Sequence, residues 1–133
     1  MSRAAAYALL VGDSELSALG VTAQTVIANN AVDTMREIPF VVLRWEEVQT
    51  RWGKAGSRGK QRLTVWAHDR SGDYTRINTV LDRIKVLYEP VQHLVGVDGR
   101  TITQFDWVGE SADLYDDGFK TICRNHAYDV VGR

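Results

Sequence analysis

The clearest hydrophobic pattern in the chain is helical and spans residues 73–89. Apolar side chains recur there three or four positions apart, and most charged side chains fall between them. Asp73 offers an N-cap for this segment, and Pro90 supplies its end. The pattern predicts an amphipathic helix that packs across a sheet. The expected apolar stripe consists of Ile77, Val80, Leu81, Ile84, Leu87 and Tyr88.

Two segments with the alternation of β-strands flank a glycine-rich stretch in the first half of the chain. The first, FVVLRWEEVQ at 40–49, is rich in β-branched and aromatic residues and follows Pro39, which suits a strand edge. The second, RLTVWAH at 62–68, alternates again and places Trp66 on the face opposite Leu63 and Val65. Together they predict a long β-hairpin over about 40–68.

Shorter elements complete the predicted order. Alanines and leucines at 3–10 favour a short N-terminal helix, which Gly12 ends. Residues 126–133 carry no clear pattern. The other expected elements are a helical turn at 15–20, a short strand at 24–28, a strand pair at 92–97 and 102–108, and a last strand at 119–125. The predicted fold class is α+β: a small, mostly antiparallel sheet packed by the helix at 73–89 and the N-terminal helix.

Composition is that of an ordinary globular domain. The 133 residues are 44% hydrophobic and 25% charged, which predicts one domain, 1–133, with a core that needs no disulfides. A single cysteine, Cys123, excludes an intramolecular disulfide framework. The sequence contains no run of eighteen apolar residues, so we expect no membrane span. The start, MSRAAAYALLVGDSE, is too weakly apolar for a secretory signal. We therefore expect a soluble protein made in the cytoplasm.

The near-neutral net charge of −1 conceals one strongly basic segment. Residues 50–62, TRWGKAGSRGKQR, carry five basic side chains and no acid, whereas 1–49 and 63–133 each carry a net charge of −3. Three glycines in this segment predict a loop that is mobile in the free protein. Exposed tryptophan and arginine are typical anchors of protein contacts, although Trp52 also suits packing on its own hairpin or stacking on a nucleic-acid base. The candidate interface residues are Arg51, Trp52, Lys54, Arg58, Lys60 and Arg62.

Motifs for nucleotide binding and nucleophilic catalysis do not fit the chain. A phosphate loop needs four residues between its glycines and a Ser or Thr after its lysine, but five residues separate Gly53 from Gly59, and Gln61 follows Lys60. Cys123 and His126 lie three apart, a spacing that puts their side chains on opposite faces of a strand. We expect Cys123 to be a small buried side chain.

Candidate metal ligands are equally weak. His68 with Asp69 and Asp73, or His93 with His126, has no recognised ligand spacing. The acidic group Asp113, Asp116 and Asp117 resembles a fragment of a calcium loop, but Tyr115 occupies a ligand position, so a solvated turn is the better interpretation. The sequence therefore predicts no catalytic residue, no metal and no cofactor.

The stretch LTVWAHD at 63–69, followed by a short polar gap and an amphipathic helix to Leu87, resembles the tail terminator (tail completion) proteins of long-tailed, siphovirus-type bacteriophages. The resemblance extends over LLVGDSELSALG, PFVVLRWEE and the closing ITQFDWVGESADLYDDGFKTICRNHAYDVVG. It implies a virion protein without an active site that forms a homo-hexameric ring, caps the tail tube, stops tube polymerisation and presents the surface that joins the head. The implied partners are other copies of the chain, the tail-tube protein and a head–tail connector or neck protein, with DNA passing through the ring lumen.

Three alternatives remain open at this stage. Another phage neck or head–tail connector protein has a related small α+β fold. A nucleic-acid-binding module would explain the basic segment, but the rest of the surface is acidic and would repel phosphate. A small enzyme would need a convergent polar site that the sequence does not show.

Overall fold

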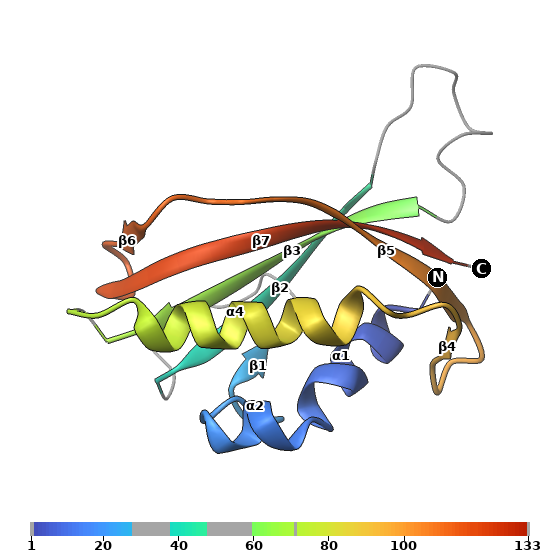
Figure 1. The fold of residues 1–133 in the computed structure, drawn as a ribbon, viewed down its shortest axis with the longest axis horizontal. Helices are drawn as coiled ribbons and strands as arrows, with labels where there is room; N and C mark the ends of the chain where they lie inside the picture. The colour runs from blue at the N-terminus through green and yellow to red at the C-terminus, as the bar shows by residue number, and fades with distance from the viewer. Residues whose placement is uncertain (1, 28–37, 48–59, 71, 133) are drawn as a thin grey trace.

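A computed structural model of the chain describes residues 2–27, 38–47, 60–70 and 72–132. Its centre is a seven-stranded sheet in the order β1-β2-β3-β7-β5-β4, with β6 pairing to β7 (Figure 1). β1 and β2 are parallel, and the other pairs are antiparallel, so the predicted α+β class is confirmed. The elements are α1 (Arg3–Val11), α2 (Ser14–Ala18), β1 (Val26–Ile27), β2 (Phe40–Glu47), β3 (Lys60–Asp69), α4 (Thr75–Tyr88), β4 (Leu94–Val95), β5 (Thr101–Glu110), β6 (Leu114–Asp116) and β7 (Thr121–Gly132).

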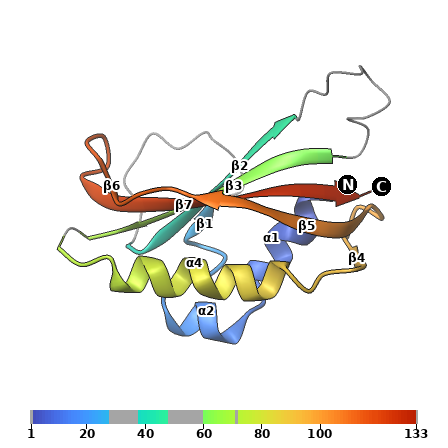
Figure 2. The same cartoon turned by 45° about the horizontal axis from the view of Figure 1, so that its top comes forward.

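The helices of the described residues lie on one face of the sheet, and α4 packs on β3 and β7 (Figures 1 and 2). The predicted stripe of α4 is buried except for Leu87, which is half-buried. The helix begins at Thr75 rather than at 73, so the predicted N-cap role of Asp73 is wrong in detail. The Asp73 carboxylate nevertheless accepts hydrogen bonds from the backbone N–H of Thr75 at 2.9 Å and from its Oγ1 at 2.7 Å. It thereby satisfies a donor that the first turn would leave free.

The predicted hairpin is present as β2 and β3, which pair from Phe40 with His68 to Glu47 with Gln61. Leu43 and Val65 face the helices and are fully buried, because alternate strand residues point to the same face. Trp66 lies on the opposite face and is half-buried, as its register predicts. β3 begins at Lys60, so the predicted loop boundary at 62 is wrong, and residues 48–59 lie outside the described part of the chain.

The last strand is longer and more central than the sequence predicts. We expected a strand at 119–125, but β7 runs from Thr121 to Gly132 and lies between β3 and β5. It pairs with β3 along ten consecutive positions, from Ile122 opposite Asp69 to Val131 opposite Lys60. The segment without a clear pattern is therefore the middle of the sheet.

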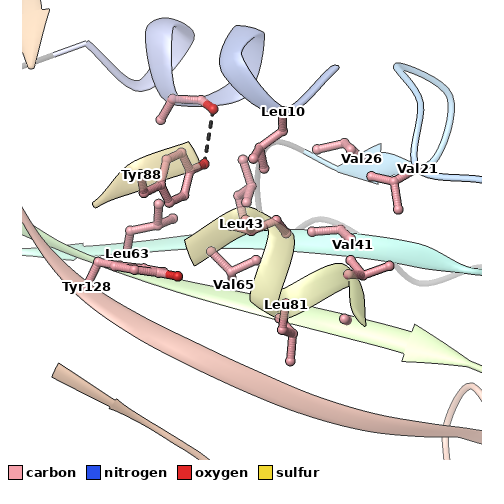
Figure 3. Packing of buried hydrophobic residues seen from close by; sticks show 14 of the residues in the cluster. Leu10, Val21, Val26, Val41, Leu43, Leu63, Val65, Leu81, Tyr88 and Tyr128 are labelled. Atoms are coloured by element: carbon pink, nitrogen blue, oxygen red, sulfur yellow. Dashed lines mark hydrogen bonds between the residues drawn. The ribbon is translucent and has the colours of Figure 1, made fainter. Parts of the chain in front are cut away.

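The core lies between the helices and the sheet (Figure 3). Tyr88 at the end of α4 is fully buried and stacks on Phe105, with ring centroids 4.1 Å apart. Its hydroxyl donates to the backbone carbonyl of Ala6 at 3.0 Å, which ties α4 to α1 (Figure 3). A buried tyrosine that keeps a hydrogen-bond partner avoids the cost of desolvating its hydroxyl.

Polar side chains fix the ends of the two N-terminal helices. The Ser2 hydroxyl caps α1 by accepting from the N–H of Ala5 and donates to the carboxylate of Asp98 at 2.8 Å. Asp13 caps α2 by accepting from the N–H of Leu16 and also pairs with Arg83 of α4 at 2.8 Å. These contacts hold α1 to the β4–β5 turn and α2 to α4.

Candidate functional site

The predicted interface residues divide into two groups. Arg51, Trp52, Lys54 and Arg58 lie outside the described residues, and their role stays a prediction. Lys60 and Arg62 are at the start of β3, where the register sets Arg62 opposite Asp129 of β7. The last three residues of the basic segment, 60–62, therefore belong to β3.

Asp129 neutralises part of the charge at the start of β3. Arg62 donates from Nε to Oδ1 of Asp129 at 3.0 Å, and Nζ of Lys60 lies 3.9 Å from Oδ2. The hydrogen bond to Asp129 raises the pKa of Arg62. Asp129 comes from the segment in which the sequence shows no clear pattern, so we expected the mobile loop that begins at residue 50 to extend through Lys60 to Arg62. That expectation is wrong.

Cys123 and His126 do not form a nucleophile–base pair. The two side chains lie on opposite faces of β7, as their spacing predicts, with Cys123 opposite His68 and His126 opposite Val65. Burial raises the pKa of the Cys123 thiol, which is 3% exposed. A buried thiol with a raised pKa is a poor nucleophile.

His68 has a structural environment rather than a catalytic one. Its ring stacks on Phe40, with centroids 4.5 Å apart, and meets the edge of Phe119 at 5.7 Å. Its Nδ1 lies 2.9 Å from the hydroxyl of Thr121. Burial lowers the pKa of His68, so the ring is neutral at pH 7.

The neighbourhood of Asp69 has an open depression of about 560 Å³ at the start of α4. The Asp69 carboxylate already accepts from Nε of Arg76 at 2.7 Å and from the backbone N–H of Arg70 at 2.7 Å. The carboxylate in this depression is therefore already neutralised by Arg76 of the same chain. Within the described parts of the chain, no three His, Cys, Asp or Glu side chains gather as metal ligands. None of the described helices combines the length and apolar character needed to cross a membrane.

A second cluster, which the sequence analysis missed, joins α4 to β5 around His126. His126 is 2% exposed, packs edge-on against Trp107 with centroids 4.7 Å apart, and has Nε2 3.3 Å from Oε2 of Glu110. Lys85 of α4 places Nζ 4.1 Å from the ring centre of Trp107, a cation–π contact. Burial lowers the pKa of His126, and Nδ1 of its ring has no hydrogen-bond partner.

The outer side of this cluster is an exposed surface that we call the α4–β5 surface. Val86 is 58% exposed and Trp107 is 36% exposed. β4 pairs only with Thr101 and Ile102, so among the described residues nothing pairs with the outer edge of the rest of β5. The α4–β5 surface consists of Asp82, Lys85, Val86 and Glu89 from α4, Trp107 and Glu110 from β5, and the neighbouring Asp113 and Arg124.

Comparison with known proteins bears on the fold. No family model and no curated protein sequence matches the chain. A chain in the structure of the virion of a native gene transfer agent particle aligns with it at a TM-score of 0.74 and 14% identity, over 98% of this chain and 92% of that one. This chain shares the fold of that virion chain. A second solved protein aligns at a TM-score of 0.60 and 12% identity, over 100% of this chain and 96% of its own.

Proposed function

We propose that the chain is a structural protein of a tailed virion, and that it forms a hexameric ring that caps the tail tube. The observation that carries the proposal is the fold shared with a chain of the gene transfer agent virion along nearly the whole of both chains. The LTVWAHD stretch and the helix after it, which carry the resemblance to tail terminators, are β3 and α4. These elements pack directly on each other.

In this role the ring stops polymerisation of the tube and offers the surface to which the filled head is joined. Its partners are further copies of the chain, the tail-tube protein and a head–tail connector protein, and DNA passes through its lumen. Such a protein acts through the surfaces that bind its partners. The environments of Cys123, His68 and Asp69 agree with that, because each side chain is engaged in packing or pairing within the chain.

Tail length tests the proposal most directly. We expect deletion of the coding sequence from the phage-like element that carries it to give tubes of uncontrolled length and heads without tails, as measured by electron microscopy. Supply of the chain in trans restores the length. Normal tails on infectious particles that lack the chain would contradict the proposal. Tails of normal length beside unjoined heads would instead identify a connector protein.

A further inference from the structure

The α4–β5 surface combines acidic and apolar side chains in a way that favours a basic partner. Four carboxylates face two cations, a net charge of −2. Both cations are already engaged, since Lys85 lies 3.6 Å from Glu89, and Arg124 lies 3.3 Å from Glu110 and 3.4 Å from Asp113. The helix and the strand that carry most of these charges, α4 and β5, also expose two apolar side chains. The carboxylates are Asp82, Glu89, Glu110 and Asp113, and the apolar side chains are Val86 and Trp107.

We propose that the α4–β5 surface binds the basic segment 50–59 of a second copy of this chain. That segment carries three cations and one tryptophan and contains no acid, so its charge complements the surface. Trp52 supplies an aromatic anchor for the exposed part of Trp107, and Arg51 and Arg58 supply bidentate donors for carboxylates. Lys60 and Arg62 are not part of this contact, because Asp129 of their own chain holds them.

The segment and the α4–β5 surface belong to different parts of the sheet order. The segment 50–59 connects β2 to β3, whereas the α4–β5 surface lies along β5, and β7 separates the two sides of the sheet. A contact between two different parts of the same chain is head-to-tail when it joins two copies, and it closes into a ring when the rotation between neighbours allows it. The inference rests on the proposed self-assembly and names the contact through which it occurs.

Carbodiimide cross-linking of a mixture of ¹⁴N- and ¹⁵N-labelled protein tests the contact. The reagent joins an amine to a carboxylate that touches it, and Lys54 is the lysine of the segment. We expect cross-links from Lys54 to Asp82, Glu89 or Glu110 that join light peptides to heavy ones. Cross-links found only within one isotope would mean that the segment binds its own chain, and cross-links only to Glu46, Glu47 or Asp129 would mean that it stays at its own hairpin. Either result overturns the proposal.

Charge reversal provides the second arm, measured by sedimentation velocity. Asp82→Lys with Glu89→Lys, and separately Lys54→Glu with Arg58→Glu, should each weaken self-association by about tenfold or more. An equal mixture of the two double variants should regain it, because each reversed surface then meets a complementary one. The matched control is Asp106→Lys with Asp117→Lys, which changes the net charge equally at exposed positions away from the surface.

Equal loss in the control pair, or no recovery on mixing, would overturn the proposal. So would a wild-type chain that shows neither self-association nor inter-copy cross-links. The two proposals fail separately. If the chain limits tail length but gives no cross-link between copies, the virion role stands and this contact is wrong. If cross-links between copies form but tails assemble normally without the chain, the contact stands and the virion role is wrong.

Discussion

Single side chains on β3 and β7 determine what the basic end of the hairpin can contact. Asp129 is only 16% exposed at its side chain and accepts from Arg62, so part of the basic charge is used within the chain. His68 and Cys123 pair across the same two strands, and both are nearly inaccessible. The charge that remains for a partner is therefore that of residues 50–59.

Arg62→Gln should lower the free energy of unfolding by no more than about 1 kcal/mol, which is the usual limit for a partly exposed ion pair. Arg44→Gln should lower it less, because Glu46, its partner at 3.1 Å, is 51% exposed and Asp129 is not. Urea unfolding of both variants measures which substitution lowers the free energy of unfolding more. A larger loss for Arg44→Gln would show that the Asp129 contact is unimportant.

Two buried histidines should make the protein less stable as the pH falls from about 7 to 5. Burial lowers the pKa of His68 and of His126 below the usual 6.5 of a histidine, so the unfolded chain takes up protons first and is favoured at lower pH. The loss is at most about 1.4 kcal/mol per pH unit for each histidine.

The hydrogen bond from Arg83 lowers the pKa of Asp13, so the stability that this pair contributes is lost only below about pH 4.

His68→Phe should reduce this pH dependence, since a phenyl ring can keep the stack on Phe40 without titrating. Urea unfolding at pH 7 and pH 5 measures the difference, with the exposed His93→Gln as the matched control. An unchanged pH dependence in His68→Phe would show that His68 is not one of its sources.

Cys123→Ser should leave self-association unchanged and lower the melting temperature modestly, because the change adds a hydroxyl at a buried site next to His68. Sedimentation velocity and thermal unfolding measure the two effects. A variant that associates normally but lacks an activity found in the wild type would contradict the structural role.

At the scale of elements, helices and strands with a regular apolar pattern were predictable from the sequence, and a strand whose pattern is interrupted by polar residues was not. The stripe of α4 and the alternation of the hairpin follow directly from the sequence, because most of their buried side chains are apolar, the polar exceptions being His68 and Asp69 at the end of β3. In β7 the face toward the helices carries Arg124 and His126 as well as Tyr128 and Val130, which breaks the alternation. Both polar side chains reach Glu110 at 3.3 Å, a pairing across strands that no local pattern reveals.

Leu81→Asp in α4 should prevent folding, since Leu81 is fully buried and an unpaired carboxylate there costs several kcal/mol. Val86→Asp on the exposed side of the same helix is the matched control and should fold with nearly the melting temperature of the wild type. Circular dichroism during heating measures both. A soluble Leu81→Asp variant that melts cooperatively would show that the stripe is not core.

At the scale of the whole molecule, the fold brings together residues that the sequence keeps far apart. Lys85 and Trp107 are neighbours only because α4 crosses the sheet beside β5. The basic half of the proposed contact was therefore predictable from local composition, and the acidic half was not. The same architecture makes β7 the connection between β1–β3 on one side and β4–β5 on the other.

A chain that ends after Asn125 should fail to fold, because it loses the half of β7 that pairs with Lys60–Val65 and with most of β5. Circular dichroism and the dispersion of amide NMR signals measure this, with a chain that ends after Gly132 as the control. Cooperative unfolding of the shorter chain would show that the two sides of the sheet hold together without β7.

The position of β7 also sets the order of events during synthesis. β3 and β5 leave the ribosome before the strand that joins them, so each exposes an unpaired edge until β7 arrives. Because the pairing of β7 with β3 joins segments distant in the chain, this part of the sheet forms slowly and late. A cell that makes many copies at once therefore holds a pool of nascent chains with open strand edges, which can associate incorrectly with one another. Coexpression of a chaperone that covers exposed strand edges should consequently raise the yield of folded protein.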